Sequence, residues 1–128
     1  MPQISAGRAE VPASELVAFL RARVQDDWDH ARDAMAGDGE WRAERTVVVL
    51  ESGAEIPDVY LGTADHIARF DPARVFREVK AKRALLDLYE TTQMTDPAAG
   101  YLDGLGQALT LLALAYVDDA DYREEWKP

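Results

Sequence analysis

The sequence predicts a mainly helical α+β fold, with about three substantial helices and a small β-hairpin between the first and the second. Three observations predict it. Apolar residues recur at steps of three and four in three long segments, as they do along one face of an α-helix. A β-branched run lies between the first two of these segments. The pairs Asp71-Pro72 and Asp96-Pro97 precede the last two, and Asp followed by Pro is a strong signal for a helix start.

The first helix is expected to begin after Ser14, because serine caps helix N-termini, and to end near Gly37-Asp38-Gly39. Residues 1–12 contain glycine and proline without a periodic pattern, so we expect a flexible N-terminal arm. Residues 13–128 are expected to form a single globular domain, since the chain is too short for two independent cores. The apolar face of the first helix is predicted to comprise Leu16, Phe19, Leu20, Val24, Trp28, Ala31 and Met35.

The hairpin is predicted between Trp41 and Tyr60. Its first strand region, Trp41–Leu50, ends in the β-branched run, and Glu51-Ser52-Gly53 supplies a turn. Ile56–Tyr60 is expected to form the second strand. Two strands alone are only marginally stable, so they must lie on the helices.

A short helical turn over residues 63–70 is expected before the second long helix, which is predicted to run from Pro72 to about Thr92. Lys82 falls near the centre of its apolar stripe. Its stem is expected to lie along apolar surface while the ammonium group reaches water or a carboxylate; a catalytic lysine is the alternative. The stripe is predicted to comprise Val75, Phe76, Val79, Leu85, Leu86, Leu88 and Tyr89.

The last helix is expected to run from Pro97 to Tyr116. Its apolar run Ala108–Ala115 predicts the most buried element of the fold. The residues that follow are expected to form an ordered tail, anchored by Tyr122 and Trp126.

Acidic side chains outnumber basic ones by 24 to 14, giving a formal net charge of −10. This balance disfavours direct nucleic-acid binding, because phosphate contacts need Lys and Arg. The absence of cysteine excludes disulfides and thiolate chemistry. No apolar run approaches the roughly 20 residues that span a bilayer, and the N-terminus lacks the layout of a signal peptide. We therefore expect a cytoplasmic protein that does not associate with membranes.

The basic charge is concentrated in one window of the second long helix and the residues before it. It can pair with the acidic tail Asp118–Glu125, which is the usual fate of a charge run, or bind an anionic partner. The window contains Arg69, Arg74, Arg77, Lys80, Lys82 and Arg83.

Two small clusters are candidates for chemistry. Asp26, His30 and Asp33 lie at helical spacing and are weak candidates for a metal site, although helical carboxylates usually form a solvated face. The second cluster lies near the start of the second long helix, where guanidinium groups favour an anion or an acidic partner. Its members are His66, Arg69, Arg74 and Arg77. No catalytic residue and no cofactor is predicted.

The segment ADHIARFDPARVFREVKAKR and the ending DYREEW resemble a family of small actinobacterial and actinobacteriophage proteins of unknown function. Members commonly read HIARHDPARVLREVEAKR in the centre and LALPYADHPDYREEW at the end. This chain departs from that pattern with Phe70 in place of histidine, Ala115 in place of proline, and Asp119-Ala120 in place of His-Pro. The resemblance implies a host range and no activity, and the departures remove two histidines from any metal or acid–base mechanism.

Three functions are therefore carried forward. The first is a noncatalytic protein-interaction or modulator protein that binds another protein through its acidic first helix or its basic window, residues 69–83. The second is an enzyme or binding domain for an anionic small molecule in the region of His66 and the three arginines. The third is an acidic mimic of DNA. A ligand site needs a pocket where the four side chains converge, whereas an interaction protein needs an exposed patch. A homodimer is left open.

Overall fold

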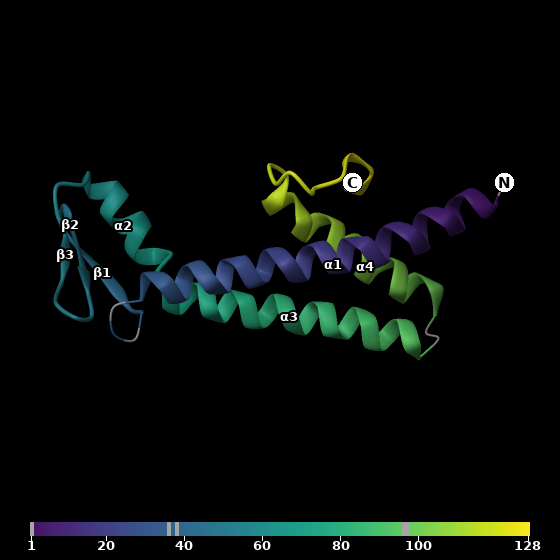
Figure 1. Ribbon diagram of the computed structural model, residues 1–128, viewed down its shortest axis with the longest axis horizontal. Helices are drawn as coiled ribbons and strands as arrows, with labels where there is room; N and C mark the ends of the chain where they lie inside the picture. Colours follow the sequence, from purple (N-terminus) through teal and green to yellow (C-terminus); the bar gives the residue numbers. More distant parts are fainter. Residues whose placement is uncertain (1, 36, 38, 96–97) are drawn as a thin grey trace. The chain divides into compact units, whose positions relative to one another are not determined.

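The structure is a computed structural model that describes residues 2–35, 37, 39–95 and 98–128. Within the chain, Met1–Val24 and Lys82–Pro128 form one compact unit and Gln25–Ala81 form a second. We call them the first and second units and describe each by itself. Over the described residues the fold is mainly helical with one small antiparallel sheet, as predicted, but it has four α-helices rather than three (Figure 1).

The elements follow one another along the chain. They are α1 (Pro2–Ala34), β1 (Trp41–Glu44), β2 (Val47–Leu50), β3 (Glu55–Ile56), α2 (Leu61–Arg69), α3 (Pro72–Met94), α4 (Ala99–Ala113) and the 3₁₀ turns η1 (Leu114–Tyr116) and η2 (Glu124–Trp126). None of the helices in the described segments is long and apolar enough to cross a membrane. The cytoplasmic location stays a prediction.

Helix α1 begins at Pro2, so Ser14 lies inside the helix and the predicted N-cap at Ser14 is wrong. The residues before Ser14 include alanine, glutamine, arginine and glutamate, which favour helix. Extending a helix that already exists is also much easier than nucleating one, so glycine and proline in this segment do not end it. Whether residues 1–12 are mobile stays a prediction.

In the second unit, the sheet has the strand order β1-β2-β3 and is antiparallel throughout. Trp41 pairs with Leu50 and Glu44 with Val47, so residues 45 and 46 form a tight turn that the sequence analysis missed. Arg45 occupies that turn at φ 61°, without the glycine or asparagine that usually signals it.

The turn predicted after β2 is present, but the strand that follows it is only Glu55–Ile56 instead of the predicted Ile56–Tyr60. Pro57 has no N–H to donate to the ladder, and Asp58 has φ 61°, which is incompatible with an extended strand. Helix α2 then packs on β1 and β2 (Figure 1). It begins two residues before the predicted range of 63–70 and ends one residue before its end.

Helix α3 begins at Pro72, as the Asp-Pro signal predicted. Asp71 caps it, because its Oδ1 accepts a hydrogen bond from the backbone N–H of Arg74 at 2.9 Å. Asp71 is only 9% exposed, and its Oδ2 accepts a second bond from the backbone N–H of Trp41 at 3.1 Å. The backbone N–H of Ala73 donates to the carbonyl oxygen of Gly39 at 3.1 Å. The start of α3 is therefore tied to the start of β1.

In the first unit, α1, α3, α4 and the C-terminal tail share one apolar core. Phe19 lies at its centre, with its ring 5.9 Å from that of Tyr122 and 5.0 Å from that of Trp126. Trp126 is 3% exposed, so the tail is anchored as predicted. The buried members of the core are Leu16, Val17, Phe19, Leu20, Leu86, Tyr89, Leu109, Ala113 and Trp126.

Two expectations about burial in this unit are wrong. Leu88, predicted to widen the inner stripe of α3, is 44% exposed. The apolar run of α4 buries Leu109 and Ala113, while Leu111 is 57% and Leu114 is 40% exposed. The first unit buries one face of α4, so the outward positions stay exposed although they are apolar. The Asp96-Pro97 start predicted for the last helix lies outside the described residues.

Candidate functional site

A groove of about 410 Å³ opens in the second unit, between the last turns of α1 and the first turns of α3. We call it the α1–α3 groove. Its lining residues are Asp27, His30, Ala31, Ala34, Trp41, Phe70, Pro72, Val75 and Glu78.

The two helices contribute one face each to the groove. The lining positions of α1 are spaced by three and four residues and those of α3 by three, so each set lies on one side of its helix. Ala31 and Ala34 carry short side chains and leave room between the helices. Nearby, the rings of Trp28 and Phe76 pack at 4.5 Å and hold α1 against α3 within this unit. The groove is therefore flanked by a packed helix pair.

Two aromatic side chains form the remaining walls. Trp41 is fixed where β1 begins, because its backbone N–H is bonded to Asp71. Its indole Nε1 is buried and has no hydrogen-bond partner. Phe70 is the C-cap residue of α2 and is 44% exposed. A phenylalanine this exposed beside a groove is available to a ligand or partner.

Phe70 also contacts two of the residues that the sequence analysis selected. The His66 ring lies 4.8 Å from the Phe70 ring, and Cζ of Arg74 lies 4.4 Å from the Phe70 centroid. Arg74 Nε donates to Glu78 Oε2 at 3.0 Å. One guanidinium group therefore stacks on Phe70 and pairs with a carboxylate of the groove at the same time.

Hydrogen-bond acceptors dominate the polar part of the groove. Among the described lining residues, the charged ones are Asp27 and Glu78, and none is Lys or Arg. His30 Nδ1 lies 2.8 Å from the backbone oxygen of Asp26. A carbonyl oxygen only accepts, so Nδ1 is the donor in this bond.

The predicted anion cluster is only partly assembled. Arg74 and Arg77 line a second hollow of about 360 Å³, together with Glu78 and Ala81. The carboxylate of Glu78 already binds Arg74 there. His66 and Arg69 are exposed and do not line either hollow. The four predicted residues therefore do not share either of these two hollows.

Two carboxylates of the acidic tail pair with an arginine of α1. In the first unit, Arg23 Nη1 lies 2.8 Å from Asp119 Oδ1 and 3.6 Å from Asp121 Oδ2. Arg123, within the tail, binds Glu15 at 2.8 Å. The ion pair with Asp119 therefore comes from α1, which the sequence presents as an acidic helix. The pairing of Arg69, Arg74 and Arg77 with the tail stays a prediction.

The weak metal candidates do not form a coordination shell. His30 turns Nδ1 to the backbone oxygen of Asp26, and Asp33 lies 3.6 Å from Arg32. Over the part of the chain that the structure describes, no group of three or more His, Asp or Glu side chains is arranged to hold a metal ion.

Lys82, the candidate at the centre of the α3 stripe, is half-buried in the first unit. Its Nζ donates to the hydroxyl oxygen of Tyr116 at 3.0 Å. The ammonium group lies 5.3 Å from the centroid of the same ring. This arrangement places Lys82 in a structural contact between α3 and η1.

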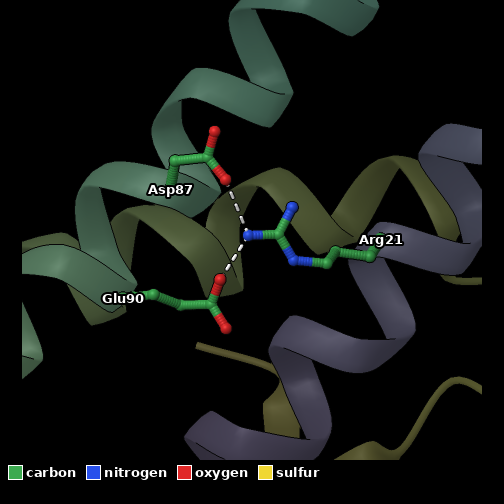
Figure 2. A network of polar contacts seen from close by, with 3 residues as sticks. All are labelled: Arg21, Asp87 and Glu90. Carbon is green, nitrogen blue, oxygen red and sulfur yellow. Dashed lines mark hydrogen bonds and ion pairs between the residues drawn. The ribbon is translucent and has the colours of Figure 1, made fainter.

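Figure 2 shows a polar network in the first unit that sequence reasoning missed. Arg21 Nη2 donates to Asp87 Oδ1 at 2.9 Å and also to Glu90. Two hydrogen bonds raise the pKa of the Arg21 guanidinium above its ordinary value. The bond to Glu90 has the larger effect and the bond to Asp87 the smaller. Because the network joins α1 to α3 across more than 60 residues of sequence, no local pattern could have indicated it.

A family model of unknown function, DUF6221, matches residues 13–128. The chain belongs to this family. The match confirms the resemblance to a family of unknown function, and it covers every lining residue of the α1–α3 groove. No curated protein and no solved structure matches the chain.

Proposed function

We propose that this DUF6221 protein is a noncatalytic protein-interaction protein and that the α1–α3 groove is its docking site. The single observation that carries the proposal is a groove walled by Trp41 and the half-exposed Phe70. Aromatic residues are enriched at the energetic centres of protein interfaces. All lining residues of the groove belong to the second unit, so this unit alone forms the docking site.

The apolar surface continues beyond the groove. Met35 is 38% exposed and lies close to Gly39, as Pro72 of the groove does. An exposed methionine on the Pro72 side of the groove extends the area that a partner can cover. This favours a macromolecular partner over a small molecule that fills the groove alone.

An anionic small-molecule site is the second candidate. The hollow that Arg74 and Arg77 line supports it, since two arginines line one space. The carboxylate of Glu78 in the same hollow opposes it, because an incoming anion must compete with that carboxylate for Arg74. We therefore place this function second.

Site-specific capture tests the docking proposal. Wild-type protein, Phe70→Ala and the control Tyr60→Ala are each tagged and used to isolate partners from an actinobacterial lysate. Tyr60 is the matched control because it is an aromatic residue of the same unit, is 85% exposed and does not line the groove. A photo-crosslinking amino acid at position 70 then identifies the protein that contacts the groove.

We expect one partner to be captured by wild type and Tyr60→Ala and at least about tenfold less by Phe70→Ala, the loss typical of an interface hot spot. The same partner should crosslink at position 70. Equal capture by Phe70→Ala, with native circular dichroism for all three proteins, would contradict the proposal.

A further inference from the structure

We propose that the α1–α3 groove binds an arginine side chain of the partner protein. This inference rests on the proposed function, since it assumes that the groove is a docking site, and it names the chemistry that the groove recognises. Charge, wall chemistry and size each support it.

The charge of the groove favours a cation. Asp27 and Glu78 are its charged lining residues over the described chain. The groove also lies along the last two turns of α1, which ends at Ala34, and the C-terminal end of a helix carries partial negative charge. A donor-rich cation is complementary to this set and would compete with Arg74 for Glu78.

The walls favour a guanidinium group in particular. A planar guanidinium stacks on aromatic faces and donates several hydrogen bonds in its own plane, which a lysine ammonium cannot do. Arg74 demonstrates both contacts within the chain, with Cζ 4.4 Å from the Phe70 centroid and Nε 3.0 Å from Glu78. A partner's arginine can make the same two kinds of contact from inside the groove, with Trp41 as the second aromatic wall.

The size admits one extended side chain. A volume of about 410 Å³ lies near the lower end of the range of roughly 300–1,000 Å³ found for small-ligand pockets. A whole helix needs a longer surface. The groove therefore fits the anchor residue of a segment whose other residues lie on the surrounding surface.

Peptide titration of the full chain, followed by nuclear magnetic resonance, tests this inference. The probe is the peptide Ac-Ala-Ala-Arg-Ala-Ala-amide, and its matched control replaces arginine with citrulline, which has the same shape without the charge. Lysine and leucine versions complete the set. The indole N–H signal of Trp41, assigned with Trp41→Phe, reports on the groove, and that of Trp126, which is 3% exposed in the first unit, serves as the reference.

We expect the arginine peptide to shift the Trp41 signal in a saturable way, and the citrulline peptide to bind about tenfold more weakly. Glu78→Gln should remove most of that preference. Glu55→Gln, an exposed carboxylate of β3 outside the groove, should keep it.

Four outcomes would overturn the inference: no shift with any peptide, equal binding of the arginine and citrulline peptides, an unchanged preference in Glu78→Gln, or tighter binding of the leucine peptide, which would identify an apolar anchor instead. In each of these cases a partner that is lost on Phe70→Ala would leave the proposed function standing, so the two failures are distinguishable.

Discussion

Asp71 binds the backbone N–H of Trp41 with one carboxylate oxygen while it caps α3 with the other. One side chain therefore fixes both the helix start and an aromatic wall of the groove. Asp71→Ala should lower the free energy of unfolding by about 2 kcal/mol, since it loses a helix cap and leaves a partly buried N–H without its partner. Urea denaturation measures the loss. Asp65→Ala, at an exposed position of α2, is the control and should change stability by less than about 0.5 kcal/mol.

Gly39 allows the chain to pass close to the start of α3. Its φ is +85°, and a Cβ at this position would lie 3.1 Å from Cβ of Pro72 and 3.2 Å from the backbone nitrogen of Ala73. Gly53 has φ +93° but open space around the same position. Gly53→Ala should cost about 1 kcal/mol through backbone strain alone, and Gly39→Ala about 2–3 kcal/mol because steric contact adds to it. If thermal denaturation showed the same loss of stability for both variants, the steric contact of a Cβ at position 39 with Pro72 and Ala73 would be unimportant.

Two leucines on opposite sides of α4 test the finding that only one face of this helix is buried. Leu109 is 0% exposed and Leu111 is 57% exposed. Leu109→Ala should destabilise the protein by about 2–5 kcal/mol through loss of burial and an unfilled cavity. Leu111→Ala should change the free energy of unfolding by about 0.5 kcal/mol or less. A large loss for Leu111→Ala would mean that this face is covered in solution.

Burial raises the pKa of Tyr89 above its ordinary value, and Asp103 raises it further. The unfolded chain then releases the phenolic proton at a lower pH than the folded chain. The ordinary pKa of tyrosine is 10.0, and below it the protein keeps the full contribution of Tyr89 to its free energy of unfolding. Part of that free energy is lost as the pH rises from the ordinary pKa toward the higher pKa of Tyr89 in the folded chain. Denaturation experiments between about pH 8 and pH 11 should therefore show that the free energy of unfolding falls less in Tyr89→Phe than in wild type. Tyr60→Phe, at an 85% exposed position, should follow wild type; a loss in Tyr89→Phe as large as in wild type would contradict this assignment.

Local signals predicted the fold where a short segment determines the structure. The Asp71-Pro72 pair indicated both the cap and the first residue of α3, and the structure has them there. The turn at Arg45 contains no glycine or asparagine to signal it. The pairing of β1 with β2 on either side imposes its positive φ. The exposed face of α4 could not be predicted either, because burial depends on which face of the helix the rest of the unit covers.

Local sequence signals predicted the candidate site only in part as well. His66 and Arg74 were selected for their charge, and the structure brings both to Phe70. The only sequence signal at Phe70 is its departure from the family pattern. Trp41 and His30 meet in the groove because β1 and α1 are brought together by the fold, and a single sequence holds no periodic or motif signal for such a contact.

Arg74 distinguishes the two candidate functions, because it has opposite roles in them. In the arginine-binding groove it competes for Glu78 and stacks on Phe70, so Arg74→Gln should tighten binding of the arginine peptide by about two- to threefold. In an anion site it is a ligand, so the same change should abolish binding of inorganic phosphate. Arg77→Gln is the control, since Arg77 lines the second hollow and not the groove. It should leave peptide binding unchanged. Weaker peptide binding by Arg74→Gln, together with loss of a measurable phosphate affinity, would favour the anion site over the arginine-binding groove.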